Sequence, residues 1–385
     1  MKILVIGDSN SIFIKQYIEY VLLDEGRNQI VLIEENSTNG DYMKFYSEHG
    51  VAVEPRVNEK NRILARIPKI RAGVANRIWC SQIRKKYGRF DLVHIHGLNY
   101  SRGNIALYTR GNTEKLAITV WGDEIFRVDD KTAAAYQKYY DVADRITVST
   151  TDMYRKFDTV YGGKYRSVVT MNKFGIGVLD YIDQVKKLYS REQICREYGI
   201  RDPDKRTVFV GHNGRAAQRH LEITKSLAAL SEAARKNITL VYTMTYGVPG
   251  EDYLNSMVAE AQKLGCDFVV LRKYMNEIQT AKLRSICDVM LHAQLTDAFS
   301  ASICESLYAG AVIFNGSWLQ YNDLPDHHRC FVEYDQIEEI PGKLEMLLED
   351  FDVHKSSYAG NTGVIRDICS REATTQKWKQ SLFEM

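Results

Sequence analysis

Short apolar runs recur along the whole chain, and stretches with helical spacing separate them. Several of the runs are apolar at every position, which is typical of parallel strands covered by helices on both faces. The runs are 2–6, 29–33, 92–95, 116–120, 145–149 and 167–171 in the first half, and 207–211, 237–243, 267–271, 289–292, 311–314 and 330–332 in the second. Two successive arrays of strands and helices predict an α/β protein with two doubly wound, Rossmann-like domains.

The alternation of strands and helices is interrupted between residues 174 and 206. There FGIGVLDY leads into a helical stretch, and the charged loop RDPDKR follows. We therefore predict an N-terminal domain over 1–175 and a C-terminal domain over 176–365. Residues 366–385 have helical spacing and predict a final helix.

The bulk composition narrows the class of protein. A length of 385 residues gives each of two domains a core of ordinary size. No apolar run approaches the roughly 20 residues that a membrane-spanning helix needs, and the first apolar run is too short for a signal peptide. The net charge of +2 does not indicate nucleic-acid binding. Seven cysteines without C-x-x-C spacing fit a reducing compartment, so we expect a cytoplasmic protein.

The stretch DVMLHAQLTDAFSASICESLYAGAVIFNG, residues 288–316, carries the strongest candidate chemistry. An apolar run leads into a polar loop with Asp297, a helix with Glu305 follows, and Gly310 ends that helix before the next apolar run. This order places two carboxylates around the N-terminus of one helix, whose N–H groups and dipole suit a phosphate group. The carboxylates can hold hydroxyl groups attached to that phosphate, so the arrangement indicates a nucleotide-sugar.

A second stretch, VFVGHNGRAAQRHLEITKSL at 208–227, reads as a strand, a glycine-containing loop and a helix. Gly211 and Gly214 would let the backbone come close to a ligand, and Arg215 could hold a diphosphate through paired, charge-assisted hydrogen bonds. An ordinary turn with a solvated Arg215 is the alternative. We favour the phosphate role because this loop and the 297–305 loop would lie at the same edge of one sheet.

Residues 297–310 resemble the E-x7-E region of the retaining family-4 (group 1) glycosyltransferases, which is roughly E-G-F-G-x-x-x-x-E-A-x-A-x-G-x-P-V. Asp297 and Glu305 stand at the two acidic positions, Phe299 at the aromatic one and Gly310 at the helix-ending glycine. The spacing is kept, although the first acid is one methylene shorter. Further departures include Ala298 and Ser300, which replace two glycines.

The 211–220 segment is similar to the same family, with Arg215 at the G-R position and His220 at the spacing of a missing lysine. Its G-x-x-G pattern, followed by His and Leu-Glu, also resembles the thymidine-diphosphate aminofucose transferases. These resemblances imply the GT-B fold, in which two Rossmann-like domains face a central cleft and a C-terminal helix crosses back to the first domain. They also imply that the second domain binds the nucleotide-sugar.

The resemblance gives individual residues of the second domain a role toward the donor. Glu305 would bind the ribose hydroxyls, Asp297 would be catalytic on the side of the sugar where positive charge develops, and Arg215 would stabilise the diphosphate with Arg219 or His220. The donor-binding residues that we expect are Gly211, Asn213, Gly214, Arg215, Arg219, His220, Phe299, Ser300, Ala301, Ser302 and Glu305.

The first domain contains acceptor-side candidates by the same resemblance. In ITVWGDEIF, residues 118–126, Glu124 takes the place of the acid in the W-G-A-D motif of the aminofucose transferases. His94 and His96 face one side of a strand, and His96 at the strand end is the better placed to reach the cleft. We expect Glu124 and His96 to be catalytic. The alternatives are a helix N-cap by Asp123 with a solvated Glu124, and a packed, hydrogen-bonded histidine.

The segment from Lys60 to Arg89 has ten basic residues and no acidic one. Ile63, Ile67 and Val74 are among apolar residues that recur there at helical spacing, which outlines a basic amphipathic helix able to lie on an anionic membrane. The alternative is a helix that packs on its own sheet and exposes a basic face.

We therefore predict a glycosyltransferase that moves a sugar from a nucleoside-diphosphate donor to a hydroxyl of a glycan or lipid-linked acceptor, with retention, in cell-surface polysaccharide or glycoconjugate synthesis. No cofactor or essential metal is expected, because the D-x-D within RDPDKR (201–206) reads as a turn. The predicted location is cytoplasmic, with peripheral attachment to the inner face of the plasma membrane as an option. The alternatives are a GT-B sugar-nucleotide epimerase and a non-catalytic GT-B-like subunit that binds a partner glycosyltransferase.

Overall fold

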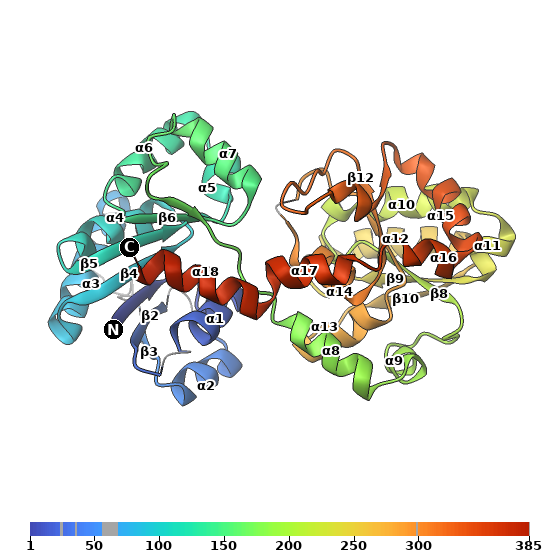
Figure 1. The fold of residues 1–385 in the computed structure, drawn as a ribbon, viewed down its shortest axis with the longest axis horizontal. Helices are drawn as coiled ribbons and strands as arrows, with labels where there is room; N and C mark the ends of the chain where they lie inside the picture. Colours follow the sequence, from blue (N-terminus) through green and yellow to red (C-terminus); the bar gives the residue numbers. More distant parts are fainter. Residues whose placement is uncertain (24–25, 35–36, 56–67, 298, 385) are drawn as a thin grey trace. The chain divides into compact units, whose positions relative to one another are not determined.

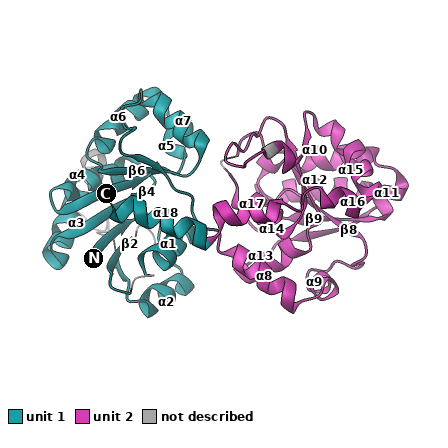
Figure 2. Cartoon of the chain, in the orientation of Figure 1, with its two compact units in different colours: residues 1–175, 371–385 teal, residues 176–370 magenta. Residues whose placement is uncertain are grey.

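The chain divides into two compact units. Unit 1 contains residues 1–175 and 371–385, and unit 2 contains residues 176–370 (Figure 2). The computed structural model describes residues 1–23, 26–34, 37–55, 68–297 and 299–384.

Unit 1 is built on one parallel sheet, which has seven strands in the described residues. The strands are β1 (Lys2–Ile6), β2 (Gln29–Glu34), β3 (Ala52–Pro55), β4 (Phe90–His96), β5 (Thr113–Thr119), β6 (Arg145–Val148) and β7 (Val169–Met171). Their order across the sheet is β3-β2-β1-β4-β5-β6-β7. The helices of this unit are α1 (Ile12–Tyr17), α2 (Gly40–Glu48), α3 (Pro68–Tyr87), α4 (Tyr100–Arg110), α5 (Asp123–Phe126), α6 (Asp130–Tyr140), α7 (Thr151–Val160) and α18 (Arg371–Phe383) (Figure 1).

Both faces of this sheet are buried, which explains why several of its strands are largely apolar. In β1, Leu4 and Ile6 join one core with side chains of α3, α4, α6 and α7, whereas Ile3 and Val5 join the core on the other face. The second core includes Trp378 of α18, whose Nε1 donates to the carbonyl oxygen of Lys173 at 2.7 Å. The C-terminal helix is therefore part of unit 1.

Unit 2 repeats the design with a parallel sheet of six strands in its described residues. The strands are β8 (Arg206–Val210), β9 (Ile238–Thr243), β10 (Asp267–Leu271), β11 (Val289–His292), β12 (Val312–Gly316) and β13 (Val332–Tyr334), in the order β10-β9-β8-β11-β12-β13. The helices are α8 (Val178–Leu188), α9 (Arg191–Glu197), α10 (His220–Ser226), α11 (Glu232–Lys236), α12 (Glu251–Lys263), α13 (Glu277–Ser285), α14 (Ala301–Ala309), α15 (Ile340–Glu349), α16 (Phe351–Ser356) and α17 (Asn361–Cys369).

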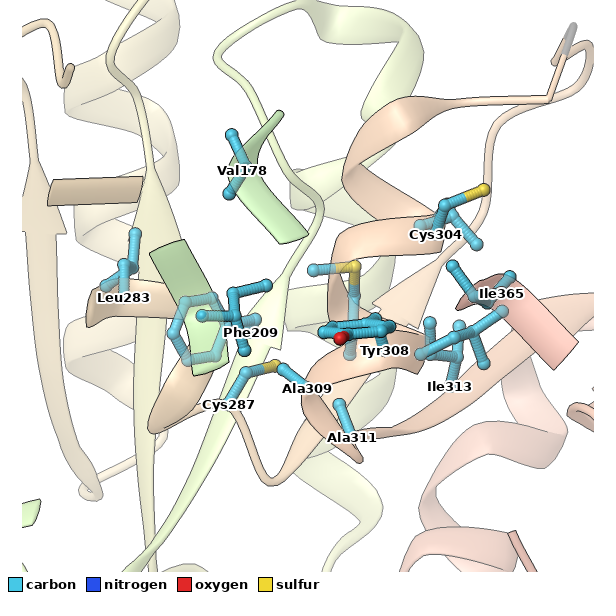
Figure 3. Close-up of a cluster of buried hydrophobic side chains, with 14 of the residues drawn as sticks. Val178, Phe209, Leu283, Cys287, Cys304, Tyr308, Ala309, Ala311, Ile313 and Ile365 are labelled. Carbon is cyan, nitrogen blue, oxygen red and sulfur yellow. The ribbon is translucent and has the colours of Figure 1, made fainter. Parts of the chain in front are cut away.

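The core on one face of this sheet anchors α14. Cys304 and Tyr308 of α14 belong to one core cluster with side chains of α8, α13 and α17 and with Phe209 of β8 and Ile313 of β12 (Figure 3). On the opposite face, α10, α12 and α15 pack against the sheet. Because α14 is held along its length, its N-terminus has a well-defined position at the sheet edge.

The prediction of an α/β protein with two doubly wound domains is confirmed, and each of the twelve predicted apolar runs overlaps a strand. The short edge strand β3 was not predicted. The predicted helix over 366–385 is two helices, α17 and α18, because Ser370 between them has extended backbone (φ −64°, ψ 157°). Of the helices described, none has the length and apolar character needed to span a membrane.

Candidate functional site

The candidate site of unit 2 lies at the carboxyl end of its sheet, where parallel strands deliver their loops to one edge. Val210 of β8 pairs with Leu291 of β11, and His292 of β11 pairs with Asn315 of β12. The loops that follow these three strands therefore start side by side. They carry most of the residues that the sequence indicated for the donor.

The loop after β8 is folded tightly on protein atoms. Gly211 has a positive φ of 68°, and a Cβ there would come within 2.9 Å of the side-chain oxygen of Gln218. A Cβ at Gly214 would overlap Val248. Asn213 accepts a hydrogen bond from the backbone N–H of Arg215 at 2.9 Å, which closes the turn. The two glycines are thus explained by packing of the loop itself.

Arg215 is the exposed cation of this loop. Its aliphatic part covers Gly247, where a Cβ would meet the arginine side chain, and its guanidinium has no hydrogen-bond or ion-pair partner in the described part of the chain. Arg219, by contrast, has a left-handed backbone (φ 59°) at the start of α10, and its Nε lies 3.7 Å from Glu222. Of the two arginines, Arg215 is the one whose charge is available to an anion.

His220 stands at the spacing of the lysine in the family-4 pattern, and it is fully buried. Its Nδ1 lies 2.9 Å from the hydroxyl of Tyr253. Burial lowers the pKa of His220 to about 4, so the ring is neutral at pH 7. It brings no positive charge to a diphosphate.

Asp297 is the centre of a buried network in the loop after β11. Its Oδ2 accepts from the backbone N–H of Ser300 at 3.2 Å and from the hydroxyl of Tyr321, and it lies 3.6 Å from His292 Nε2. Burial alone would raise the pKa of Asp297, but His292 and Tyr321 outweigh it, and the net shift is downward. The carboxylate is therefore ionised at neutral pH although it is nearly buried.

The turn between Asp297 and α14 depends on Phe299, which has a positive φ of 70° and whose ring lies 5.9 Å from that of Tyr321. Ser300 is the N-cap residue of α14, but its side chain makes no capping hydrogen bond. Its carbonyl oxygen accepts from Ile303 and Cys304. Within the described residues, the N–H groups of Ala301 and Ser302 have no protein acceptor, which is the arrangement that an anion can use.

Glu305 is in a different environment from the rest of the predicted set. Its Oε2 accepts from Arg284 Nε of α13 at 3.0 Å, and both side chains are less than 10% exposed. Burial raises the pKa of Glu305 above its ordinary value, against the opposing effect of Arg284. The ribose role expected from the resemblance would have to be met by an acid that is already in a buried ion pair.

The acceptor-side candidates lie in unit 1 at the carboxyl end of its sheet. Glu124 is 3% exposed, and its Oε1 accepts from the backbone N–H groups of Leu98 at 2.9 Å and Trp121 at 3.0 Å. Burial raises the pKa of Glu124, although these N–H groups oppose the shift. Its contacts are those of a carboxylate that joins the loops after β4 and β5.

His96, at the end of β4, is buried against aromatic rings. The ring centroids of Tyr17, Trp121 and Phe174 lie 4.7, 6.3 and 6.1 Å from its own. Neither ring nitrogen has a hydrogen-bond partner among the described residues. Burial, with help from His94 and Arg102, holds the pKa of His96 well below its usual value, so the ring is neutral.

Sequence reasoning missed His212, His292, Tyr321 and Arg284. His292 is the last residue of β11, and His212 comes two residues after the end of β8, so a polar residue at a strand end was the available signal. Tyr321 and Arg284 gave no such signal, because they come from segments far from their partners in sequence and only the fold brings them together.

Two further predictions concern segments outside this edge. The 60–67 part of the predicted basic helix lies outside the described residues. In the described part of α3, Trp79 and Ile83 join the core of unit 1, while Arg77 and Arg84 are exposed. The D-x-D of 201–206 forms a turn before β8, and no cluster of three potential metal ligands occurs in the described ranges.

Solved structures resemble this chain over its whole length. A glycosyltransferase from Rickettsia africae matches with a TM-score of 0.78 and 14% identity, over 100% of this chain and 99% of that one. HepE from Anabaena in complex with UDP and glucose matches with a TM-score of 0.71 and 13% identity, over 100% of both chains. UDP-GlcNAc 2-epimerase from Neisseria meningitidis bound to UDP-GlcNAc matches with a TM-score of 0.68 and 10% identity, over 100% of both chains. No protein-family model and no curated protein matches the sequence. The chain therefore has the GT-B fold of two Rossmann-like units.

Proposed function

We propose that this chain is a glycosyltransferase that moves a sugar from a nucleoside-diphosphate donor to a hydroxyl of a glycan or lipid-linked acceptor, with retention. The observation that carries the proposal is the combination found at one sheet edge. Arg215 offers a guanidinium without an acid partner in the described residues, α14 offers the N–H groups of Ala301 and Ser302, and Asp297 is an ionised carboxylate held within three residues of that helix end.

The charges suit the bond that has to break. Cleavage of the sugar–diphosphate bond leaves negative charge on the diphosphate and positive charge at the anomeric carbon. Arg215 and the helix N-terminus would stabilise the first, and Asp297 would stabilise the second. Each preorganised group of this kind is worth roughly 100- to 1000-fold in rate. The acceptor hydroxyl would attack on the face that the diphosphate leaves, and the diphosphate would take its proton.

Support for a nucleotide-sugar donor comes from the neighbours of this fold. HepE has been crystallised with UDP and with UDP-glucose, and it covers 100% of this chain. Glu305 would reach the ribose only through the carboxylate oxygen that Arg284 does not hold.

The test is a thermal-shift panel of UDP, GDP and dTDP with their hexose derivatives, followed by turnover assays on the compounds that bind. We expect one base to raise the melting temperature, and release of its nucleoside diphosphate to depend on an added hydroxyl acceptor. A panel in which no compound shifts the melting temperature would contradict the proposal.

The structural match to the epimerase of Neisseria meningitidis also extends over the whole chain. It supports a second candidate function, which is isomerisation of a nucleotide-sugar without an acceptor. NMR of the nucleotide-sugar with the protein alone separates the two. A new isomer of unchanged mass would favour the epimerase, whereas the transferase leaves the donor unchanged until an acceptor is added.

A lipid-linked acceptor would bring the protein to the inner face of the plasma membrane, in polysaccharide or glycoconjugate synthesis. The exposed Arg77, Arg84 and Lys85 of α3 support this location through attraction to anionic lipid. Co-sedimentation with liposomes tests it, and equal recovery with and without anionic lipid would contradict it.

A further inference from the structure

Hydrogen bonding determines which nitrogen of His212 carries the proton. The backbone N–H of His212 donates to Gln218 Oε1 at 3.1 Å, which orients the amide of this buried glutamine. The amide nitrogen then faces His212 Nε2 at 3.3 Å and must be the donor. Burial lowers the pKa of His212 to about 3, so the ring is neutral and its one proton is on Nδ1.

The opposite tautomer follows for His292. The ionised Asp297 can only accept, so the hydroxyl proton of Tyr321 points to Asp297. The Tyr321 oxygen therefore accepts from His292 Nε2, which lies 3.2 Å away, and the same nitrogen lies 3.6 Å from Asp297. With a proton on Nε2 alone, His292 carries a lone pair on Nδ1.

The two remaining nitrogens are complementary and close. In these tautomers His212 Nδ1 is a donor and His292 Nδ1 is an acceptor. Both nitrogens are buried, and neither has a partner among the described residues. Their ring centroids lie 5.7 Å apart. The two rings are therefore close enough for one small group to contact both.

We propose that His212 and His292 together bind one hydroxyl group of the donor sugar. A hydroxyl both accepts and donates, so it matches one N–H and one lone pair, whereas an unprotonated phosphate oxygen only accepts and would leave His292 unpaired. The assignment rests on the proposed function and applies equally to a transferase and to an epimerase. It makes this pair the part of the site that distinguishes sugars.

The position of the pair fits this role. His212 lies three residues before Arg215, and His292 lies five residues before Asp297, so the hydroxyl would be held at the sheet edge that offers the diphosphate contacts. His212 is 6% exposed and His292 is not exposed at all. A hydroxyl bound there is removed from water. A sugar that lacks this hydroxyl would leave both nitrogens buried without a partner, and this loss would weaken its binding.

The tautomers can be tested without a ligand. Long-range ¹H–¹⁵N spectra of the protein with labelled histidine, assigned with the His212→Phe and His292→Phe variants, report the protonated nitrogen of each ring. We expect Nδ1–H for His212 and Nε2–H for His292. The reverse tautomer of either ring, or a doubly protonated His292 at pH 7, would overturn the assignment.

The hydroxyl is tested by comparing two affinities. For the base found in the panel, titration calorimetry gives the dissociation constants of the nucleoside diphosphate and of its hexose derivative. In either phenylalanine variant, the gain in affinity that the sugar provides should fall about tenfold, which is the scale of one hydrogen bond lost in a buried site. The affinity for the nucleoside diphosphate should stay within about twofold of the wild-type value. His94→Phe, which removes a buried and fully hydrogen-bonded histidine of unit 1, is the matched control and should leave both affinities unchanged.

Should the variants fail to fold, the wild type answers the question with nucleotide-sugars that each lack one hydroxyl. One of these deoxy compounds should lose about tenfold in affinity, and the others much less. If a nucleoside diphosphate binds but every deoxy compound keeps the gain in affinity that the sugar provides, the inference is wrong. An internal water would then satisfy the two rings, and the proposed function would still stand. If no nucleotide binds at all, the proposed function fails first.

Discussion

The two sheet edges use their polar residues in different ways. At the edge of the first sheet, Glu124 is held by two backbone N–H groups, and His94 bonds to Tyr17 and Thr119. At the edge of the second sheet, Arg215 has no acid partner in the described part of the chain, and Asp297 is ionised although nearly buried.

The difference concerns what kind of ligand each edge is prepared for. Charges that protein groups already satisfy stiffen loops, whereas a charge without a partner can stabilise charge on a ligand. The second edge is therefore suited to a charged diphosphate. The first edge, where the neutral His96 and Trp121 Nε1 are buried without a hydrogen-bond partner in the described residues, is suited to a neutral hydroxyl compound.

The largest expected effect comes from removing the charge of the second edge. Asp297→Asn keeps the size of the side chain but loses the negative charge that would face the anomeric carbon. We expect the turnover number to fall roughly 100- to 1000-fold, measured as initial rates of sugar transfer. Asp202→Asn, in the turn before β8, is the control and should keep full activity. A rate within twofold of wild type for Asp297→Asn would contradict its role.

Arg215→Ala should weaken nucleoside diphosphate binding roughly 10- to 100-fold, because it removes a charge-assisted hydrogen bond. Calorimetric titration measures this directly. The affinity of Arg215→Lys should lie between those of the wild type and Arg215→Ala, since lysine keeps the charge but cannot form paired hydrogen bonds. Arg196→Ala, on the exposed face of α9, serves as the matched control. Equal affinities of wild type and Arg215→Ala would place the diphosphate elsewhere.

Acid should destabilise both edges through their buried histidines. Burial lowers the pKa of His94 to about 3 and that of His220 to about 4. Below the unfolded value of about 6.5 the unfolded chain binds protons that the folded chain does not, so stability present above pH 6.5 is lost as pH falls toward the folded pKa. We expect each histidine to cost about 2 kcal/mol between pH 6.5 and pH 5, measured by urea unfolding.

In that experiment, His94→Gln distinguishes the contribution of His94 to the pH dependence from those of the other buried histidines. The variant removes the contribution of His94 and leaves those of His96 and of the second edge, so its unfolding free energy should change less with pH than that of the wild type. An unchanged pH dependence would mean that His94 is not held neutral by its surroundings.

The smallest effect belongs to the first edge. Glu124→Gln should lower the unfolding free energy by at most about 1 kcal/mol, because the amide oxygen accepts the two backbone hydrogen bonds less strongly while burial already disfavours the carboxylate charge. Thermal unfolding measures the loss, and Glu114→Gln, an exposed acid on β5, is the control. Nucleoside diphosphate affinity should not change, and a tenfold loss would contradict the division of roles between the edges.

The fold could be predicted from the sequence because strands buried on both faces leave a strong signal. The run 2–6 is β1 and the run 289–292 is β11, residue for residue. The edge strand β3 gave a weaker signal, since Ala52–Pro55 is short, half-buried and ends at a proline. The break at Ser370 was not predicted either, because it depends on where α17 and α18 each pack.

The candidate site could be predicted only in its sequence-local parts. Asp297, Ser300 and the start of α14 are close in the chain, and their spacing alone indicated a helix N-terminus with an acid beside it. The partners that determine the state of those groups come from elsewhere. Tyr321 holds Asp297, and Arg284 holds Glu305, through contacts that the tertiary structure creates.

The most direct measurement is a crystal structure of the protein with the nucleotide-sugar that the binding panel identifies. We predict its diphosphate within hydrogen-bonding distance of the Arg215 guanidinium and of the N–H groups of Ala301 and Ser302, with the sugar facing Asp297. A nucleotide-sugar bound in unit 1, or on another surface of unit 2, would contradict the account.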